Sequence, residues 1–89
     1  RDVIKLIEAE NLYFSAHTWS SALNTAASVH LLAISTQGRC MDFKPHESPM
    51  QHELVADPWV QEDGYLKVRS SPGLGVTVLE EVVRKYLLA

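Results

Sequence analysis

The residue of this chain that is best placed to do chemistry is His17, which directly follows a short apolar run. The run, residues 12–16, contains a leucine, two aromatic residues and an alanine, and its length and composition favour a buried strand. An imidazole gains or loses a proton near neutral pH, so His17 could act as a general acid or base with little tuning. The alternative is a loop histidine that only caps the next helix.

A second group of titratable residues lies in the irregular stretch 45–58, which holds His46, Glu47, His52 and Glu53. These residue types can bind metal ions, but their spacing matches no standard zinc pattern and a proline interrupts them. We therefore interpret His46 and Glu47 as residues that contact a substrate rather than as ligands of a dedicated metal site.

Other residues with reactive or ligating side chains favour structural interpretations. Cys40 has no histidine or lysine beside it in sequence to lower the pKa of its thiol, so a buried strand thiol is preferred to a nucleophile. His30 falls within the apolar arc of a helix and is interpreted as a hydrogen-bonded core residue. Gly73 and Gly75 do not follow a strand and open a helix, as a dinucleotide-binding loop must.

The elements that must position His17 form a strand–helix–strand unit. Residues 2–10 and residues 20–34 each show the apolar spacing of an amphipathic helix, and residues 40–44 are typical of a second strand that ends at Pro45. A short strand–helix–strand connection implies two parallel strands. Because parallel sheets bury both faces, the unit requires neighbouring strands and helices and is expected to be part of a larger α/β domain.

The C-terminal part of the chain is punctuated by turns. Asp63-Gly64 indicates a tight turn, residues 65–68 then alternate like a strand, and residues 71–75 form a rigid turn. Residues 77–80 match a helix capping box with Thr77 as the N-cap. The pattern predicts that Thr77→Ala would loosen a closing helix by about 1 kcal/mol.

Composition excludes several classes of protein. The 89 residues are 46% hydrophobic and 21% charged, as in an ordinary globular chain, so disorder is not expected. A net charge of -3 provides no basic patch for nucleic acid, and no apolar run approaches the roughly 20 residues of a membrane span. One cysteine and no signal-peptide pattern favour a cytoplasmic protein.

Four segments occur in an order and spacing that resemble the C-terminal third of the mandelate racemase/muconate lactonizing enzyme family of the enolase superfamily, with acid-sugar dehydratases as the nearest type. They are residues 17–23 (HTWSSAL), 29–33 (VHLLA), 63–66 (DGYL) and 72–76 (PGLGV). The resemblance covers nearly the whole chain.

The resemblance implies an α/β fold, the C-terminal part of a TIM-like (β/α)₇β barrel. Residues 12–16 would be its seventh strand and residues 40–44 its eighth. Residues 1–58 would then hold the last β/α units and the following loop. Residues 59–89 would form a closing segment that packs toward the capping domain, with Trp59 as the anchor between the two.

The resemblance also implies a Mg²⁺-dependent enzyme that removes the proton alpha to a carboxylate. An acid-sugar dehydratase is the first expectation, and a racemase or cycloisomerase is the alternative. His17 would be the base, the acid for the departing hydroxyl, or both. The carboxylates that bind Mg²⁺ in relatives lie on earlier strands, so no metal ligand is assigned to this segment, and the segment alone is expected to be inactive.

Further site residues follow from the same resemblance. Many relatives carry a glutamate on the eighth strand that hydrogen-bonds the substrate carboxylate, and the nearest carboxylate here is Asp42, which is one methylene shorter. That role is open between Asp42 and Glu47. Trp19 either walls the substrate pocket or packs in the core. Relatives tend to have proline in place of Arg69.

The expected partners are an acid-sugar substrate, the rest of the barrel with its capping domain, and further copies of the same chain. A competing hypothesis from another class is a non-catalytic interaction module. In that case the terminal helix and Leu32 would form a partner-binding surface, and His17 would be incidental.

Overall fold

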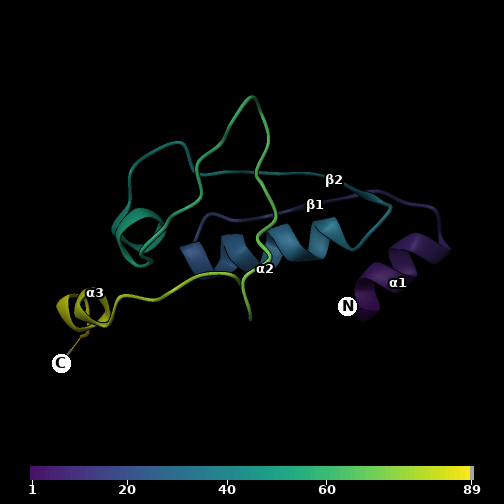
Figure 1. The fold of residues 1–89 in the computed structure, drawn as a ribbon. Helices are drawn as coiled ribbons and strands as arrows, with labels where there is room; N and C mark the ends of the chain where they lie inside the picture. Colours follow the sequence, from purple (N-terminus) through teal and green to yellow (C-terminus); the bar gives the residue numbers. More distant parts are fainter. Residues whose placement is uncertain (89) are drawn as a thin grey trace.

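The computed structural model describes residues 1–88, so Ala89, the last residue of the predicted closing segment, lies outside the described part. A helix packs against a two-stranded sheet, and a long irregular segment returns across that helix (Figure 1). The elements are α1 (Asp2–Ala9), β1 (Phe14–Ala16), α2 (Ala22–Ala33), β2 (Gly38–Met41), the π-helix η1 (Pro49–Glu53) and α3 (Glu80–Lys85). No helix within residues 1–88 is both long and apolar enough to cross a membrane.

The two strands pair in parallel, which confirms the strand–helix–strand unit. Phe14 pairs with Gly38 and Ser15 pairs with Cys40, with a bulge between the two pairs. The helix α2 runs alongside both strands and packs against them (Figure 1). The chain is therefore mixed α/β with a small sheet, as expected from sequence.

The first strand starts later than predicted because the end of α1 uses the preceding residues. Asn11 adopts a left-handed backbone with φ 53° and donates its N–H to Glu8 O at 3.1 Å. Leu12 donates its N–H to Ile7 O at 2.9 Å, so the pair completes a Schellman motif with asparagine in the usual glycine position. Leu12 thus belongs to the helix end, and β1 begins at Phe14 instead of at residue 12.

The second strand starts and ends earlier than the predicted 40–44. Gly38 lies directly against the last turn of α2, where an added Cβ would come within 2.8 Å of Leu32 Cδ2. Because glycine has no side chain, β2 can begin immediately after the chain turns at the end of α2. The strand ends at Met41, although Asp42 still donates its N–H to Ala16 O at 3.2 Å.

The helix α2 carries most of the core. Ser21 caps its first turn by accepting a hydrogen bond from the Asn24 N–H at 3.5 Å. Ala26 and Val29 are buried with Trp59, while the first turn of α2 packs against Leu54 and Val55 after η1. The small residues of α2 allow this close approach on both sides.

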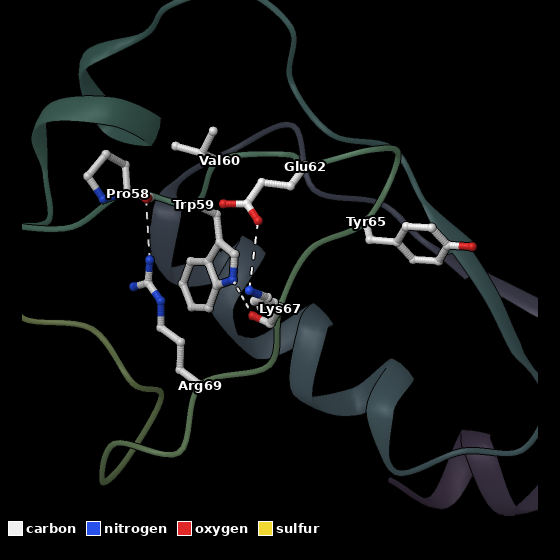
Figure 2. A pocket seen from close by; sticks show the side chains of 7 residues that line it. All are labelled: Pro58, Trp59, Val60, Glu62, Tyr65, Lys67 and Arg69. Carbon is white, nitrogen blue, oxygen red and sulfur yellow. Dashed lines mark hydrogen bonds and ion pairs between the residues drawn. The ribbon is translucent and has the colours of Figure 1, made fainter.

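Trp59 anchors the returning segment to α2 of the same chain. It is only 3% exposed, and its Nε1–H donates to Lys67 O at 3.0 Å. The guanidinium of Arg69 stacks on the indole at 3.8 Å from the ring centroid and donates to the carbonyl of Pro58 (Figure 2). It also binds the Asp57 carboxylate and the carbonyl of Gly75. A contact between Trp59 and a capping domain stays a prediction, as does the division of the chain after residue 58.

We expect Arg69→Ala to lower the stability of the intact protein by about 1–3 kcal/mol, because the stacking and the hydrogen bonds to backbone carbonyls are lost together. The matched control is Lys67→Ala. The Lys67 side chain is 89% exposed, and its ion pair with Glu62 spans 3.8 Å, so a change below about 0.5 kcal/mol is expected. Urea unfolding of both variants measures the difference, and equal unfolding midpoints would show that the Arg69 side chain does not stabilise the fold.

Two expectations for the loops need correction. The stretch 45–58 is not wholly irregular, because η1 forms within it and packs against α2. Residues 65–68 do not form a strand. Instead the Asp63-Gly64 turn, with φ values of 50° and 84°, closes a single antiparallel bridge between Glu62 and Tyr65, which confirms the turn.

The predicted capping box is wrong. Thr77 accepts the Ala56 N–H at 3.0 Å through its backbone carbonyl, and the neighbouring Val78 forms an antiparallel bridge with Val55. The backbone at residue 77 is thus held by strand-like pairing. The helix α3 starts at Glu80 after Leu79, and within the described residues no side chain caps it. Thr77→Ala is therefore no longer expected to loosen this helix.

Candidate active site

His17 and Asp42 meet at the carboxyl ends of the two parallel strands. His17 follows β1 directly and Asp42 follows β2 directly. The distance from His17 Nδ1 to Asp42 Oδ2 is 2.6 Å. The structure therefore brings together two side chains that lie far apart in sequence, at the end of the sheet where β/α barrels place their chemistry.

Strand alternation explains why both side chains point to the same face. Two residues earlier along each strand, Ser15 Oγ and Cys40 Sγ lie 3.1 Å apart on that face. Met41, on the opposite face, packs against the core of α2. Because side chains alternate, His17 and Asp42 continue the face of Ser15 and Cys40, away from α2. Cys40 is exposed in the described structure, which corrects the expectation of a buried thiol.

The carboxylate of Asp42 is held at both oxygens. Thr18 donates its backbone N–H to Oδ1 at 2.7 Å, while Oδ2 faces His17. The Thr18 hydroxyl donates to the main-chain carbonyl of Asp42. Engagement of both oxygens favours a role for Asp42 in orienting His17 over the predicted contact with a substrate carboxylate.

The pairing with Asp42 selects one tautomer of His17. An ionised carboxylate only accepts hydrogen bonds, so the hydrogen between the two groups belongs to Nδ1 of the imidazole. The neutral ring then carries its free lone pair on Nε2. The His17 side chain is 81% exposed, so this nitrogen is accessible, and Asn24 Nδ2 donates to His17 O at 3.1 Å to fix the backbone.

The other predicted site residues lie in the two loops that follow β1 and β2. Trp19 is half-exposed in the same loop as His17, and His46 and Glu47 are exposed between β2 and η1. Across residues 1–88, no hydrogen bond joins these three to the histidine–aspartate pair. Their contacts with substrate stay predictions. His30 Nε2 lies 3.3 Å from Leu74 O, so the expected hydrogen bond is present, but the side chain is half-buried and does not lie in the predicted core position.

The described residues do not fit a metal site. Nowhere in residues 1–88 do three histidine, cysteine, aspartate or glutamate side chains converge as metal ligands would. The Mg²⁺ ligands expected from the resemblance would thus have to lie outside these residues.

Two hollows of the described structure lie apart from the histidine–aspartate pair. One of about 300 Å³ is bounded by Trp59, Tyr65 and Arg69 (Figure 2), and one of about 350 Å³ lies between α2, β2 and the segment around Leu66. Neither includes His17 or Asp42 in its wall. Neither hollow brings a histidine and a carboxylate together in its wall, as the pair does.

Sequence reasoning named both members of the pair but left the orienting partner of His17 open. The signal was present, since side chains that follow two adjacent parallel strands lie at one edge of the sheet. Thr18 was missed as a site residue. A threonine that follows the key histidine carries no sequence signal for a bond to a residue on the next strand.

Comparison with known proteins agrees with this architecture. No curated protein sequence matches the chain. The solved structure of the 3,6-anhydro-D-galactonate cycloisomerase from Zobellia galactanivorans is similar over 99% of this chain, with a TM-score of 0.85 and 28% sequence identity. The chain spans a quarter of that protein's length, as the match covers 25% of it.

The family comparison covers nearly the whole described chain. Residues 1–82 match the family model described as enolase C-terminal domain-like. This result confirms the resemblance to the enolase superfamily that the sequence motifs carried. The chain belongs to the enolase C-terminal domain-like family.

Proposed function

We propose that this chain supplies the proton-transfer pair of an enolase-superfamily enzyme that removes the proton alpha to the carboxylate of an acid sugar. His17 is the base and Asp42 orients it. The single observation that carries the proposal is the 2.6 Å contact between His17 Nδ1 and Asp42 Oδ2 at the carboxyl ends of β1 and β2. The completed TIM-like barrel belongs to the same proposal, and the family membership supports it.

The proposed step follows from the tautomer. Nε2 of neutral His17 accepts the alpha proton, and the electron pair of the broken C–H bond moves into the carboxylate to form an enediolate. The ring is now an imidazolium, and the Asp42 carboxylate balances its charge through the Nδ1–H bond. Collapse of the enediolate expels the oxygen on the beta carbon, and the imidazolium can return its proton to that oxygen.

The product depends on what the beta oxygen is attached to. When it is a free hydroxyl, water leaves and the reaction is a dehydration. When it belongs to a ring within the substrate, the ring opens, nothing leaves, and the reaction is an isomerisation. The similarity to a cycloisomerase supports the second outcome, so we place cycloisomerisation of an anhydro sugar acid first and dehydration second.

Enolase-superfamily enzymes typically use Mg²⁺, and we propose the same requirement for the intact protein, with ligands outside residues 1–88. Assembly into homo-oligomers is also proposed for the intact protein. Chelation followed by restoration of activity with Mg²⁺ tests the metal requirement.

The function is tested on the intact enzyme with a panel of aldonic, aldaric and anhydro-sugar acids in the presence of Mg²⁺, starting with 3,6-anhydro-D-galactonate. Formation of a product of equal mass identifies an isomerase, and loss of water identifies a dehydratase. Absence of turnover on every carboxylate would contradict the enzyme and favour the interaction module.

A further inference from the structure

Thr18 is a fully buried polar residue whose donors both point to a single partner. Its relative exposure is 0%, and it lies in the loop between β1 and α2. The backbone N–H donates to Asp42 Oδ1 at 2.7 Å, and the side-chain hydroxyl donates to the Asp42 main-chain carbonyl. With the bond from the Asp42 N–H to Ala16 O at 3.2 Å, three hydrogen bonds tie the end of β1 and the loop after it to this one residue.

These bonds constrain Asp42 at two levels. The hydroxyl of Thr18 fixes the peptide group of Asp42, and so the place where its side chain leaves the backbone. The amide N–H of Thr18 then holds Oδ1, which leaves Oδ2 directed at His17 Nδ1. A carboxylate attached through a single methylene has few other torsions, so a fixed backbone and one held oxygen define the position of the second oxygen.

We propose that Thr18 is a positioning residue that sets the tautomer of His17 through Asp42. Because its hydroxyl holds the backbone of Asp42, loss of the hydroxyl lets the carboxylate drift from Nδ1, and the ring then populates the tautomer with its hydrogen on Nε2. That tautomer cannot accept a proton at Nε2. The inference rests on the proposed function, since it assigns a role within the same proton-transfer pair.

A purely structural role for Thr18 makes a different prediction. The hydroxyl would then only satisfy a buried carbonyl, and its removal would reduce stability without changing the protonation of the neighbouring ring. Thr25 provides a control for this case. It is also 0% exposed, and its hydroxyl donates to Gln51 Oε1 at 3.0 Å within the core. Within residues 1–88 its side chain forms no hydrogen bond with His17 or Asp42.

The test uses Thr18→Val, Thr18→Ser and Thr25→Val in the intact enzyme. The readout is the ¹⁵N and ¹H NMR spectrum of the histidine rings in the resting enzyme without substrate, with the His17 signals assigned by their absence in His17→Asn. We expect the Nδ1–H signal of His17 in the wild type, its loss in Thr18→Val, and its retention in Thr18→Ser and Thr25→Val. On an active substrate, kcat of Thr18→Val should fall about tenfold or more with little change in KM, and serine should rescue it.

An unchanged His17 spectrum and an unchanged kcat in Thr18→Val would overturn the proposal and leave Thr18 as a structural tie. If the valine protein does not accumulate, Thr18→Ala removes the hydroxyl without adding bulk and gives the same comparison. The tautomer readout needs no turnover, so the two proposals fail separately. If the Nδ1–H signal is lost in Thr18→Val but the wild type is inactive on every acid sugar, the proposed function alone is refuted. If the wild type is active but its His17 signal is unchanged in Thr18→Val, the positioning role alone is refuted.

Discussion

The His17→Asn variant of the intact enzyme is expected to turn over its acid-sugar substrate at least about a hundredfold more slowly than the wild type. Asparagine keeps a polar side chain of similar reach but has no acid–base capacity at neutral pH, and a positioned proton-transfer group contributes at least this factor. Stability should hardly change, because the His17 side chain is 81% exposed and its ion pair is open to solvent. Steady-state kinetics and a thermal melt measure the two effects.

The control for this variant is His52→Asn. His52 accepts the Ser48 N–H at 3.0 Å within the loop that holds η1, and we assign it no part in proton transfer. Its kcat should remain within about threefold of the wild type, far from the loss expected of a proton-transfer group. Near-normal turnover of His17→Asn would leave His17 as a residue at the entry to α2.

Asp42→Asn is expected to reduce kcat by at least about tenfold and to affect KM little. An asparagine can still accept the Thr18 N–H through its oxygen, but it then presents an NH₂ donor to His17 Nδ1. The ring responds by placing its hydrogen on Nε2, so the nitrogen that faces the substrate can no longer accept a proton. Loss of the negative charge also leaves the imidazolium unbalanced.

The matched control is Asp63→Asn, the same chemical change in an exposed turn with φ 50°, a conformation that asparagine tolerates well. Its turnover and stability should match those of the wild type. An Asp42→Asn enzyme with unchanged kcat but a large increase in KM would instead indicate that Asp42 binds the substrate directly, as the relatives' glutamate does.

How far the sequence predicted the structure depends on the range of the interactions. The strand–helix–strand unit and the Asp63-Gly64 turn follow from local periodicity and turn chemistry, and both are confirmed. The first and last residues of the strands do not follow from local patterns, because Asn11 extends the end of α1 and Gly38 lets β2 start against Leu32. These are contacts between elements that no local pattern reports.

The same distinction applies to the site. His17 was identified because it follows an apolar strand, a local signal. Its pairing with Asp42 depends on the register of two parallel strands, and the role of Thr18 depends on burial. The capping-box prediction failed for a similar reason, since long-range pairing between Thr77 and Ala56 determines the backbone there.

Hydrogen exchange in D₂O shows whether His17 removes the alpha proton. The intact wild type and His17→Asn are incubated with the acid sugar that the panel identifies, and ¹H NMR follows the alpha proton of the substrate and the deuterium content of the product. We expect solvent exchange of the alpha proton to accompany turnover in the wild type and to be absent in His17→Asn. Exchange at the wild-type rate in His17→Asn would contradict the claim and show that another group is the base, with His17 at most the acid for the departing oxygen.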